Sequence, residues 1–290
     1  GFDARLADPE TGKITTLPRR VYALDPGGAF ALSLDMARLE LLRPGYGYAV
    51  TSQSSGMPRR PSDSGVWRVP LDGGAPVLIL SLADAVRWML RRFPLKQRLR
   101  HELRRYHYWF NHAKISPDGT RFTVKLRWRH PDKRWTSRQG VSLTCATDGR
   151  DLRLLSDDTS HVIWQDNDRL YCWRKGELVV LGDTAPRGTR LGALAPDVIK
   201  ANVHMRHLPP MAQRSPEKYV FDTPYSETID LKILDAETEV ATPIARFENH
   251  RPRNGPFRCD LHPCPDTSGQ KIVVTSLHDG GRQLYLLSLT

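Results

Sequence analysis

Short stretches of alternating hydrophobic and polar residues, separated by turns rich in Pro, Asp and Gly, recur along most of the chain. In "ISPDGTRFTVKLRW" (115–128) a Ser-Pro-Asp-Gly turn is followed by Phe122, Val124 and Leu126 at every second position. Side chains alternate between the two faces of a strand, so this pattern predicts two antiparallel strands joined by a tight turn. The plan recurs in two other segments and more loosely in a third: 24–35, 263–277 and 208–226.

Each of these pairs is followed by a second pair of strands around an Asp or Gly turn. The corresponding segments are 66–81, 142–156, 230–247 and the terminal strand in 282–289. Four-stranded sheets repeated at intervals of about 40–60 residues are typical of a β-propeller. We therefore predict an all-β fold, a β-propeller of six to seven four-stranded blades forming a single domain over residues 1–290. One blade can be degenerate, because residues 4–17 resemble the outer pair of strands alone.

One segment, 82–106, departs from this pattern. Ala83, Val86, Met89 and Leu90 have helical spacing, and many arginines follow the break at Pro94. We predict a helical insertion between blades. Two interpretations stay open: a solvated helix at the edge of the propeller, or a basic amphipathic helix that binds a membrane or a partner.

The charge of the chain favours anionic ligands. Lys and Arg number 43 against 32 Asp and Glu, which gives a net charge of +11. Such an excess attracts polyanions, but no zinc-finger, helix-turn-helix or RNP-type pattern supports specific binding of nucleic acid. No apolar run is long enough for a transmembrane segment. We expect a secreted or periplasmic protein rather than a cytoplasmic one, and the sequence does not predict an oligomeric state.

Histidines and a cysteine precede or begin the first strand of several predicted blades: His112, His161, His204, Cys259 and His262. The innermost strand of each propeller blade lines the central channel, so residues at equivalent ends of these strands converge. A single histidine at such a position is more often a core residue whose ring nitrogens are hydrogen-bonded within the fold. The recurrence over four blades favours a functional cluster.

The run Cys259-Asp-Leu-His262-Pro-Cys264 indicates a metal site. It offers three ligands within reach of one ion, and His161 or His204 could complete a tetrahedron. Alternatively, Cys264 is a buried strand residue and His262 bonds the next blade. A disulfide between the two cysteines would close a very tight loop and is not expected.

Arginine and tyrosine residues near the predicted inner strands indicate the ligand class. Arginine pairs bidentately with carboxylates and sulfates, and aromatic faces suit sugar rings. We therefore expect an anionic polysaccharide or oligosaccharide as the binding partner. The candidate substrate-binding residues are Arg38, Arg43, Tyr46, Asn111, Arg127, Arg206 and Arg258.

The segments "FNHAKISPDGTRFTVKLRW", "SHVIW" and "RCDLHPCPD…KIVVTSLHDGGRQLYLLSL" resemble the β-propeller polysaccharide lyases, which include oligogalacturonate and ulvan lyases. The resemblance covers roughly residues 108–290 and implies a bound divalent metal. The positions matching the metal ligands are His161, Cys259, His262 and Cys264. Two cysteines in this set favour Zn²⁺ over Mn²⁺ or Ca²⁺.

The resemblance also implies β-elimination at a uronic acid residue. A base removes the C5 proton, a cation neutralises the C6 carboxylate, and an acid protonates the departing O4. The matching acid–base residues are His112 and Tyr171. Arg174 is the candidate for neutralising the carboxylate, with Arg187 and Arg206 as alternatives.

One position departs from the pattern of these lyases. Where many of them have a second histidine, this chain has Lys125-Leu126-Arg127-Trp128, with His130 further along. A second class of function therefore stays open, a non-catalytic propeller that binds an anionic polysaccharide or a protein partner. A hydrolase is less favoured, because no pair of acidic residues recurs at the predicted blade starts.

Overall fold

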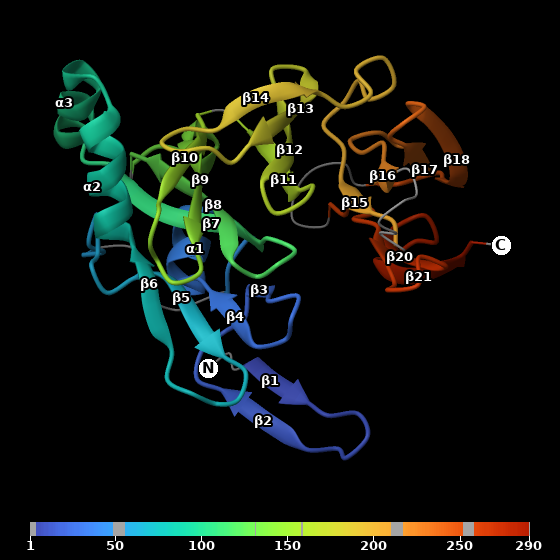
Figure 1. Ribbon diagram of the computed structural model, residues 1–290, viewed down its shortest axis with the longest axis horizontal. Helices are drawn as coiled ribbons and strands as arrows, with labels where there is room; N and C mark the ends of the chain where they lie inside the picture. The colour runs from blue at the N-terminus through green and yellow to red at the C-terminus, as the bar shows by residue number, and fades with distance from the viewer. Residues whose placement is uncertain are drawn as a thin grey trace. The chain divides into compact units, whose positions relative to one another are not determined.

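The computed structural model describes residues 4–48, 56–130, 132–157, 159–209, 217–251 and 258–289 (Figure 1). Antiparallel strands dominate, and they form six sheets in the described ranges. The chain divides into two compact units, which are described separately. The first unit comprises residues 1–158 and 183–188, and the second comprises 159–182 and 189–290. The predicted single domain over 1–290 stays a prediction.

The first unit contains three sheets whose strands follow one another in chain order. A two-stranded hairpin is formed by β1 (Ala4–Ala7) and β2 (Ile14–Leu17), as the sequence of residues 4–17 predicted. One four-stranded sheet consists of β3 (Ala23–Leu24), β4 (Phe30–Ser33), β5 (Gly65–Pro70) and β6 (Val77–Ser81). The other consists of β7 (His107–Ile115), β8 (Arg121–Arg129), β9 (Gln139–Ala146) and β10 (Arg153–Ser156), and a short 3-10 turn, η1 (Trp135–Ser137), precedes β9.

The β7–β8 hairpin shows how the sequence specifies each pair of strands. The amide of Gly119 donates to the carbonyl of Ser116 at 3.0 Å, and Gly119 has a φ of +74°. A Cβ atom at this glycine would lie 2.5 Å from Asp25 Oδ1, so both conformation and space favour glycine here. After the turn, Phe122, Val124 and Leu126 are fully buried on one face of β8.

Helices occur within the described residues of the first unit only. The helical insertion is confirmed as α2 (Leu82–Arg92) and α3 (Leu95–Leu103), separated by Pro94. The hydroxyl of Ser81 caps α2 by accepting from the amide of Asp84. A further helix, α1 (Met36–Leu42), was not predicted and contacts β7. Within the described ranges, no helix has the length and apolar character needed to cross a membrane.

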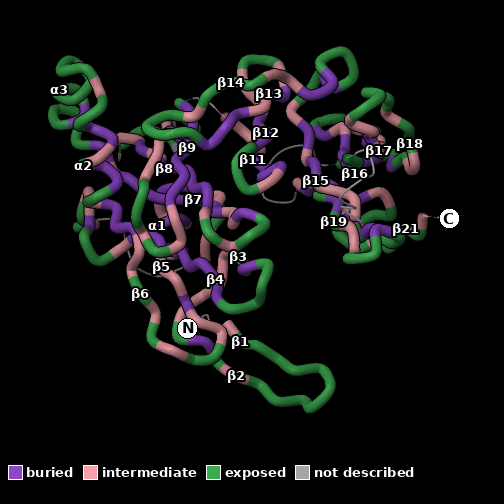
Figure 2. The backbone as a smooth tube through the Cα atoms, in the orientation of Figure 1, coloured by how far each residue is buried: buried purple, intermediate pink, exposed green. Residues whose placement is uncertain are grey.

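The second unit repeats the same connectivity. Its first sheet consists of β11 (Ser160–Trp164), β12 (Arg169–Arg174), β13 (Glu177–Gly182) and β14 (Thr189–Ala193). Its second consists of β15 (Met205–His207), β16 (Lys218–Asp222), β17 (Ile229–Asp235) and β18 (Val240–Phe247), and its third of β19 (Cys264–Pro265), β20 (Lys271–Ser276) and β21 (Gln283–Ser288). The innermost strands β11, β15 and β19 contact one another in turn. In each unit the buried residues are concentrated in the sheets (Figure 2).

His101 is the buried residue through which α3 joins the first unit. Its Nδ1 lies 2.8 Å from the hydroxyl of Tyr108, and its ring packs against Tyr106 and Trp128. Burial, together with the charges of Arg60 and Arg100, lowers the pKa of His101 to about 4. The imidazole is therefore neutral in the folded protein at neutral pH.

We expect the first unit to lose stability on acidification through His101. Below the ordinary histidine pKa the unfolded chain binds a proton here, whereas the folded chain does not until about pH 4. Between about pH 7 and pH 5, this difference lowers the free energy of unfolding by about 1–2 kcal/mol. Denaturant unfolding at both pH values should show a smaller acid destabilisation in His101→Gln than in the wild type. An equal loss in both proteins would contradict this role.

Candidate functional site

Three histidines within or just before the first strands of their sheets have an unusual backbone conformation. His112, His161 and His262 have φ values of +56°, +47° and +45°. The pairing of β7 with β8 shifts register between Asn111 and Lys114, beside His112, and that of β11 with β12 shifts between Ser160 and Ile163, beside His161. Left-handed non-glycine residues and β-bulges re-aim side chains and cluster at functional sites.

In the second unit, three histidines from the starts of consecutive inner strands lie side by side. The ring centroid of His204 is 4.3 Å from that of His161 and 4.1 Å from that of His262. His161 lies on β11, His204 immediately precedes β15, and His262 precedes β19. The predicted convergence of these blade-start histidines is therefore present within this unit.

Hydrogen bonds orient two of these rings. Nδ1 of His161 donates to the carbonyl of Val203 at 2.8 Å, and Nδ1 of His204 donates to Asp222 Oδ2 at 2.9 Å. Metal-binding histidines commonly donate one ring N–H to a carbonyl or carboxylate and coordinate through the other nitrogen. In His204 this arrangement makes Nε2 the candidate ligand atom.

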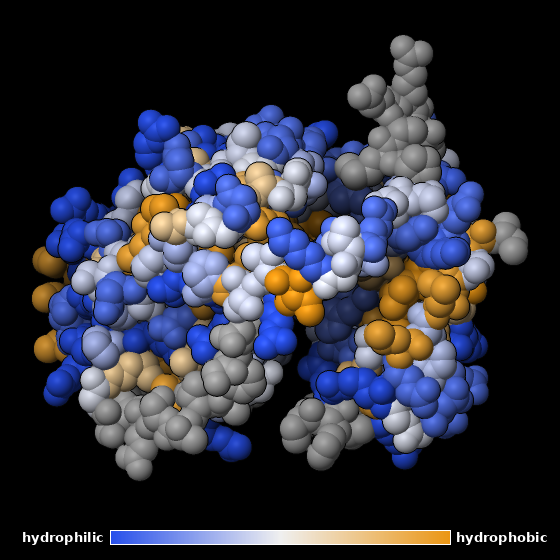
Figure 3. All heavy atoms as spheres, turned by 90° about the horizontal axis from the view of Figure 1, so that it is seen from below, coloured by the Kyte–Doolittle hydropathy of each residue, from blue (hydrophilic) through white to orange (hydrophobic). Residues whose placement is uncertain are grey.

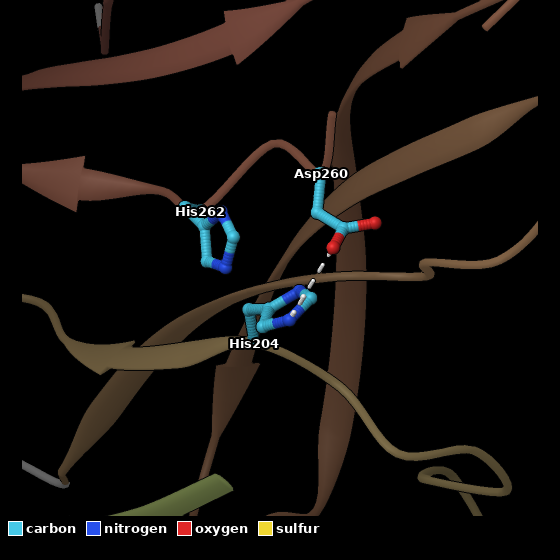
Figure 4. A group of neighbouring side chains, drawn as sticks. All are labelled: His204, Asp260 and His262. Carbon is cyan, nitrogen blue, oxygen red and sulfur yellow. Dashed lines mark ion pairs between the residues drawn. The ribbon is translucent and has the colours of Figure 1, made fainter. Parts of the chain in front are cut away.

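His204, Asp260 and His262 offer ligand atoms that all lie within 4.8 Å of one another (Figure 4). Nε2 of His204 is 4.0 Å from Asp260 Oδ2. Burial of the His262 ring lowers its pKa, and the charge of His204 lowers it further. A neutral imidazole is the form that binds a metal. We call His204, Asp260 and His262, together with the adjacent His161, the metal-ligand cluster, and the nitrogen and oxygen donors of the first three residues suit a first-row divalent ion.

The structure does not bring Cys259 or Cys264 into the group of neighbouring ligand atoms, and their role as ligands stays a prediction. Cys259 is buried, and its Sγ contacts the carbonyl of Thr275 at 3.4 Å, on β20. Cys264 is an exposed residue on β19, and neither thiol belongs to the group that could hold an ion. Asp260 lies between the two cysteines in sequence, and its carboxylate was not among the predicted ligands because aspartate is common on protein surfaces and carries no motif of its own here.

Two of the predicted substrate-binding arginines lie beside the metal-ligand cluster. Arg258 forms an ion pair with Asp260, and its guanidinium lies 4.8 Å from the ring centroid of Tyr225. Arg206 is exposed on β15, and its charge contributes to the lowered pKa of His262. Arg258 is therefore engaged in holding a candidate ligand, whereas Arg206 faces solvent.

His112 is the centre of a second candidate site, in the first unit. Nη1 of Arg43, which follows α1, lies 3.1 Å from Nε2 of His112. The ring of Tyr46 lies 3.4 Å from the Arg43 guanidinium and 6.2 Å from the His112 ring. The hydroxyl of Tyr22, a residue not singled out from the sequence, accepts from the backbone amide of His112 at 3.0 Å.

Positive charge dominates the surroundings of His112. Arg127 Nε, on β8, donates to Oδ1 of the fully buried Asn111 at 3.0 Å, and Lys125 on the same strand is also buried. Burial, followed by the charges of Lys125, Arg43 and Arg127, holds the pKa of His112 well below its ordinary value. We call Tyr22, Arg43, Tyr46, Asn111, His112, Lys125 and Arg127 the basic site.

Tyr171 does not have the environment of an acid–base residue. It is 2% exposed within the hydrophobic core of the second unit, and its hydroxyl donates to Glu217 at 3.4 Å. Burial raises its pKa above the ordinary range. Tyr171 and His112 also belong to different units. The side chain of Tyr171 packs in the core, and its predicted role as an acid–base residue stays a prediction.

Three other arginines have the following positions. Arg38 is buried, and it donates through Nε to the carbonyl of Tyr108 and through Nη2 to that of Arg59, so these contacts support the fold, and its role in substrate binding stays a prediction. Arg187 forms an ion pair with Asp157 at 3.2 Å. Arg174 ends β12 at the hairpin to β13 and does not belong to either candidate site.

Comparison with known proteins supports the fold. The sequence matches no family profile and no curated protein. Among solved structures, TolB from Acinetobacter baumannii is similar with a TM-score of 0.51 and 13% identity over 99% of this chain. An oligogalacturonate lyase in complex with manganese has a TM-score of 0.42 and 12% identity, covering 100% of this chain and 96% of its own. A periplasmic gluconolactonase of Pseudomonas aeruginosa has a TM-score of 0.41 and 12% identity, covering 99% and 80%.

The likeness to TolB shows the fold alone. This chain spans 57% of the TolB chain, and the shared architecture is the β-propeller. The predicted all-β propeller fold is therefore confirmed. Six sheets are present in the described ranges, of which four have four strands, one has three and one has two.

The metal-ligand cluster predicts which variants weaken metal binding. We expect Asp222→Asn to lower the affinity for Zn²⁺ or Mn²⁺ about 10–100-fold, because it removes the negative charge and replaces one of the two oxygens that accept from His204 with an NH2 group that cannot accept. His262→Ala should lower the affinity further, because it removes a ligand. Isothermal titration of the metal-free protein measures both effects.

The matched control is the double variant Cys259→Ser/Cys264→Ser. Its metal affinity should equal that of the wild type, since neither thiol lies in the cluster. A large loss in this double variant would restore the cysteines as ligands.

Proposed function

We propose that the protein is a polysaccharide lyase that cleaves an anionic, uronate-bearing polymer by β-elimination at the basic site. The observation that best supports this proposal is the hydrogen bond between Nη1 of Arg43 and Nε2 of His112, at 3.1 Å. Arginine can only donate, so Nε2 of His112 accepts and is the unprotonated nitrogen of a neutral imidazole. A neutral base beside a guanidinium is the pairing that abstraction of a proton next to a carboxylate requires.

The residues of the basic site divide the reaction between them. Arg43 and Arg127 bind the C6 carboxylate of the uronate and stabilise the negative charge that develops there. When Arg43 engages the substrate, Nε2 of His112 is released to take the C5 proton. The electrons of the broken C5–H bond form the C4–C5 double bond, and O4 departs. Tyr46, which is exposed, offers its ring to the sugar.

Tyr22 replaces Tyr171 as the proposed acid. Its hydroxyl accepts from the amide of His112, which places it beside the base. Burial raises the pKa of Tyr22, so the phenol keeps its proton at neutral pH and can donate it to the departing O4. One element, the segment leading into β3, thus supplies the acid, and β7 supplies the base.

We propose a structural role for the metal-ligand cluster. His204 precedes β15, and Asp260 and His262 precede β19, so an ion held by them would connect the inner strands of two sheets, with His161 of β11 beside it. A bound divalent ion supplies a fixed positive charge and ligand bonds at this point. Without sulfur in the donor set, the argument that favoured Zn²⁺ over Mn²⁺ loses its basis, and we propose a first-row divalent ion of either kind.

The alternative is a non-catalytic propeller that binds an anionic polysaccharide or a partner through the same basic site. The observation that favours it is the position of Tyr171 in the core, which removes one of the two predicted acid–base residues. Both functions use the cationic surroundings of His112, and they differ in whether a proton is transferred. For either, we propose a secreted or periplasmic location, where such polymers occur.

A lyase assay separates the two functions. We expect ultraviolet absorbance from an unsaturated product when the protein is incubated with a panel of uronate polysaccharides. His112→Gln should lower the rate about 10²–10⁴-fold, the typical contribution of a general base. The control His130→Gln changes a histidine that directly follows β8 and lies outside the basic site, and it should retain the wild-type rate.

A different result of the same assay would support binding without catalysis. Affinity for a uronate oligosaccharide, with no unsaturated product from any polymer, would contradict the lyase proposal. Loss of that affinity in Arg43→Met would then assign the basic site to binding alone.

The pH dependence of the lyase should respond to Lys125. Its charge contributes to the lowered pKa of His112, so the acidic limb of kcat/KM should lie well below pH 6.5 in the wild type. In Lys125→Met the pKa of His112 rises, and the acidic limb should move to higher pH. The exposed Lys133→Met serves as control and should leave the profile unchanged. Identical profiles for all three proteins would exclude His112 as the titrating base.

A further inference from the structure

The helix α3 is poorly covered by the rest of the first unit. Of its nine residues, His101 alone is buried. Leu95, Leu99 and Leu103 are 67%, 53% and 81% exposed, and their spacing of four residues aligns them along one side of the helix. Figure 2 shows α3 as an exposed element. Short helices usually depend on burying an apolar face against the rest of the protein. The leucines of α3 are instead exposed to solvent.

Basic side chains surround the leucine row. Between residues 91 and 105 the only acidic residue is Glu102, which pairs with Arg60 at 2.7 Å. The basic residues of this segment are Arg91, Arg92, Lys96, Arg98, Arg100, Arg104 and Arg105. Figure 3 shows hydrophobic atoms among hydrophilic ones at its left edge, where α3 lies in Figure 1.

A groove between α2 and α3 adjoins the leucine row. It has a volume of about 530 Å³, and its lining includes Leu95, Leu99, Arg91 and Arg98. Within the described ranges, neither Arg91 nor Arg98 forms an ion pair. Guanidinium groups bind phosphate bidentately, so the groove offers a place for a phosphate-bearing group directly beside exposed leucines.

We propose that α3 and this groove dock the protein on an anionic phospholipid surface. The three leucines enter the interfacial region of the bilayer, and the surrounding arginines and lysine bind lipid phosphates. This combination of an apolar row and a dense basic cluster on one short helix is what interfacial helices use. The inference goes beyond the proposed lyase function and does not depend on it.

The shape of the surface favours a bilayer over a protein partner. The leucines project from an exposed helix, and a folded partner would need a complementary groove to receive them. A bilayer accepts a projecting row without a preformed pocket. Positive charge on both sides of the row, at Lys96 and Arg100 as well as at Arg98, matches a continuous anionic surface.

Vesicle cosedimentation tests the proposal with the full chain. We expect binding to vesicles of equal parts phosphatidylcholine and phosphatidylglycerol, and little binding to phosphatidylcholine alone. The triple variant Leu95→Ser/Leu99→Ser/Leu103→Ser should bind at least about tenfold more weakly, because it removes the apolar contribution. Lys96→Glu/Arg98→Glu/Arg100→Glu should lose more than about tenfold, because each basic residue near the surface contributes about fivefold.

The matched control is Leu284→Ser/Leu286→Ser. These leucines lie on β21 and are 74% and 61% exposed, and residues 283–289 contain no basic residue. The control should bind vesicles like the wild type. All the changed side chains are exposed, so thermal unfolding midpoints should stay close to that of the wild type and show that the variants fold.

Four outcomes would overturn the proposal. They are equal binding to neutral vesicles, unchanged binding of the leucine triple variant, an equal loss in the β21 control, and lipid-free self-association that the leucine substitutions abolish. The last result would assign the row to a contact between copies of the chain. Activity on soluble oligosaccharides should be unaffected by the α3 variants, so failure of lipid docking and failure of the lyase proposal are distinguishable.

Discussion

An inner strand of this protein that is buried on both faces has little room for unpaired polar side chains. The candidate sites lie where the backbone departs from the regular strand and turns a polar side chain out of the hydrophobic faces. Both faces of a strand such as β7 are covered, so a polar side chain within the sheets must find partners or leave the ladder. A left-handed residue at a register shift breaks the alternation of side chains locally. His112, His161 and His262 have this conformation, and their imidazoles belong to the two candidate sites instead of a hydrophobic face.

The two candidate sites differ in the sign of their surroundings. Around His204 the carboxylates of Asp222 and Asp260 supply negative charge, which suits a cation. Around His112 the neighbouring charges are those of Lys125, Arg43 and Arg127, which suit an anion and keep the imidazole neutral. The same type of residue at equivalent strand positions can therefore serve opposite chemistry, because neighbouring strands set the local potential.

The large excess of positive charge has several separate uses in the structure. Arg121 and Arg153 pair with the buried Asp183 within the first unit, and Arg38 donates to backbone carbonyls, so these residues support the fold. The arginines of α3 are exposed and form a distinct surface. Composition predicts an affinity for anions, but only the structure separates the arginines that hold the protein together from those that can meet a ligand.

The sequence by itself determined most of the elements of this protein, although not the helix α1. Alternating residues around Pro-Asp-Gly turns specified the hairpins, because strand periodicity and turn geometry are local properties, and helical spacing specified α2 and α3. It also identified His112, His161, His204 and His262 as candidate residues, since each occupies an equivalent place relative to a turn.

Only the tertiary structure decided which of these side chains meet. Asp222 follows His204 by eighteen residues on the chain and orients it, and Arg43 lies far from His112 in sequence yet contacts it. Cys259 and Tyr171 looked equally suitable from their motifs, but strand pairing and core packing direct both into the interior. These contacts depend on long-range packing, which no local pattern of residues encodes.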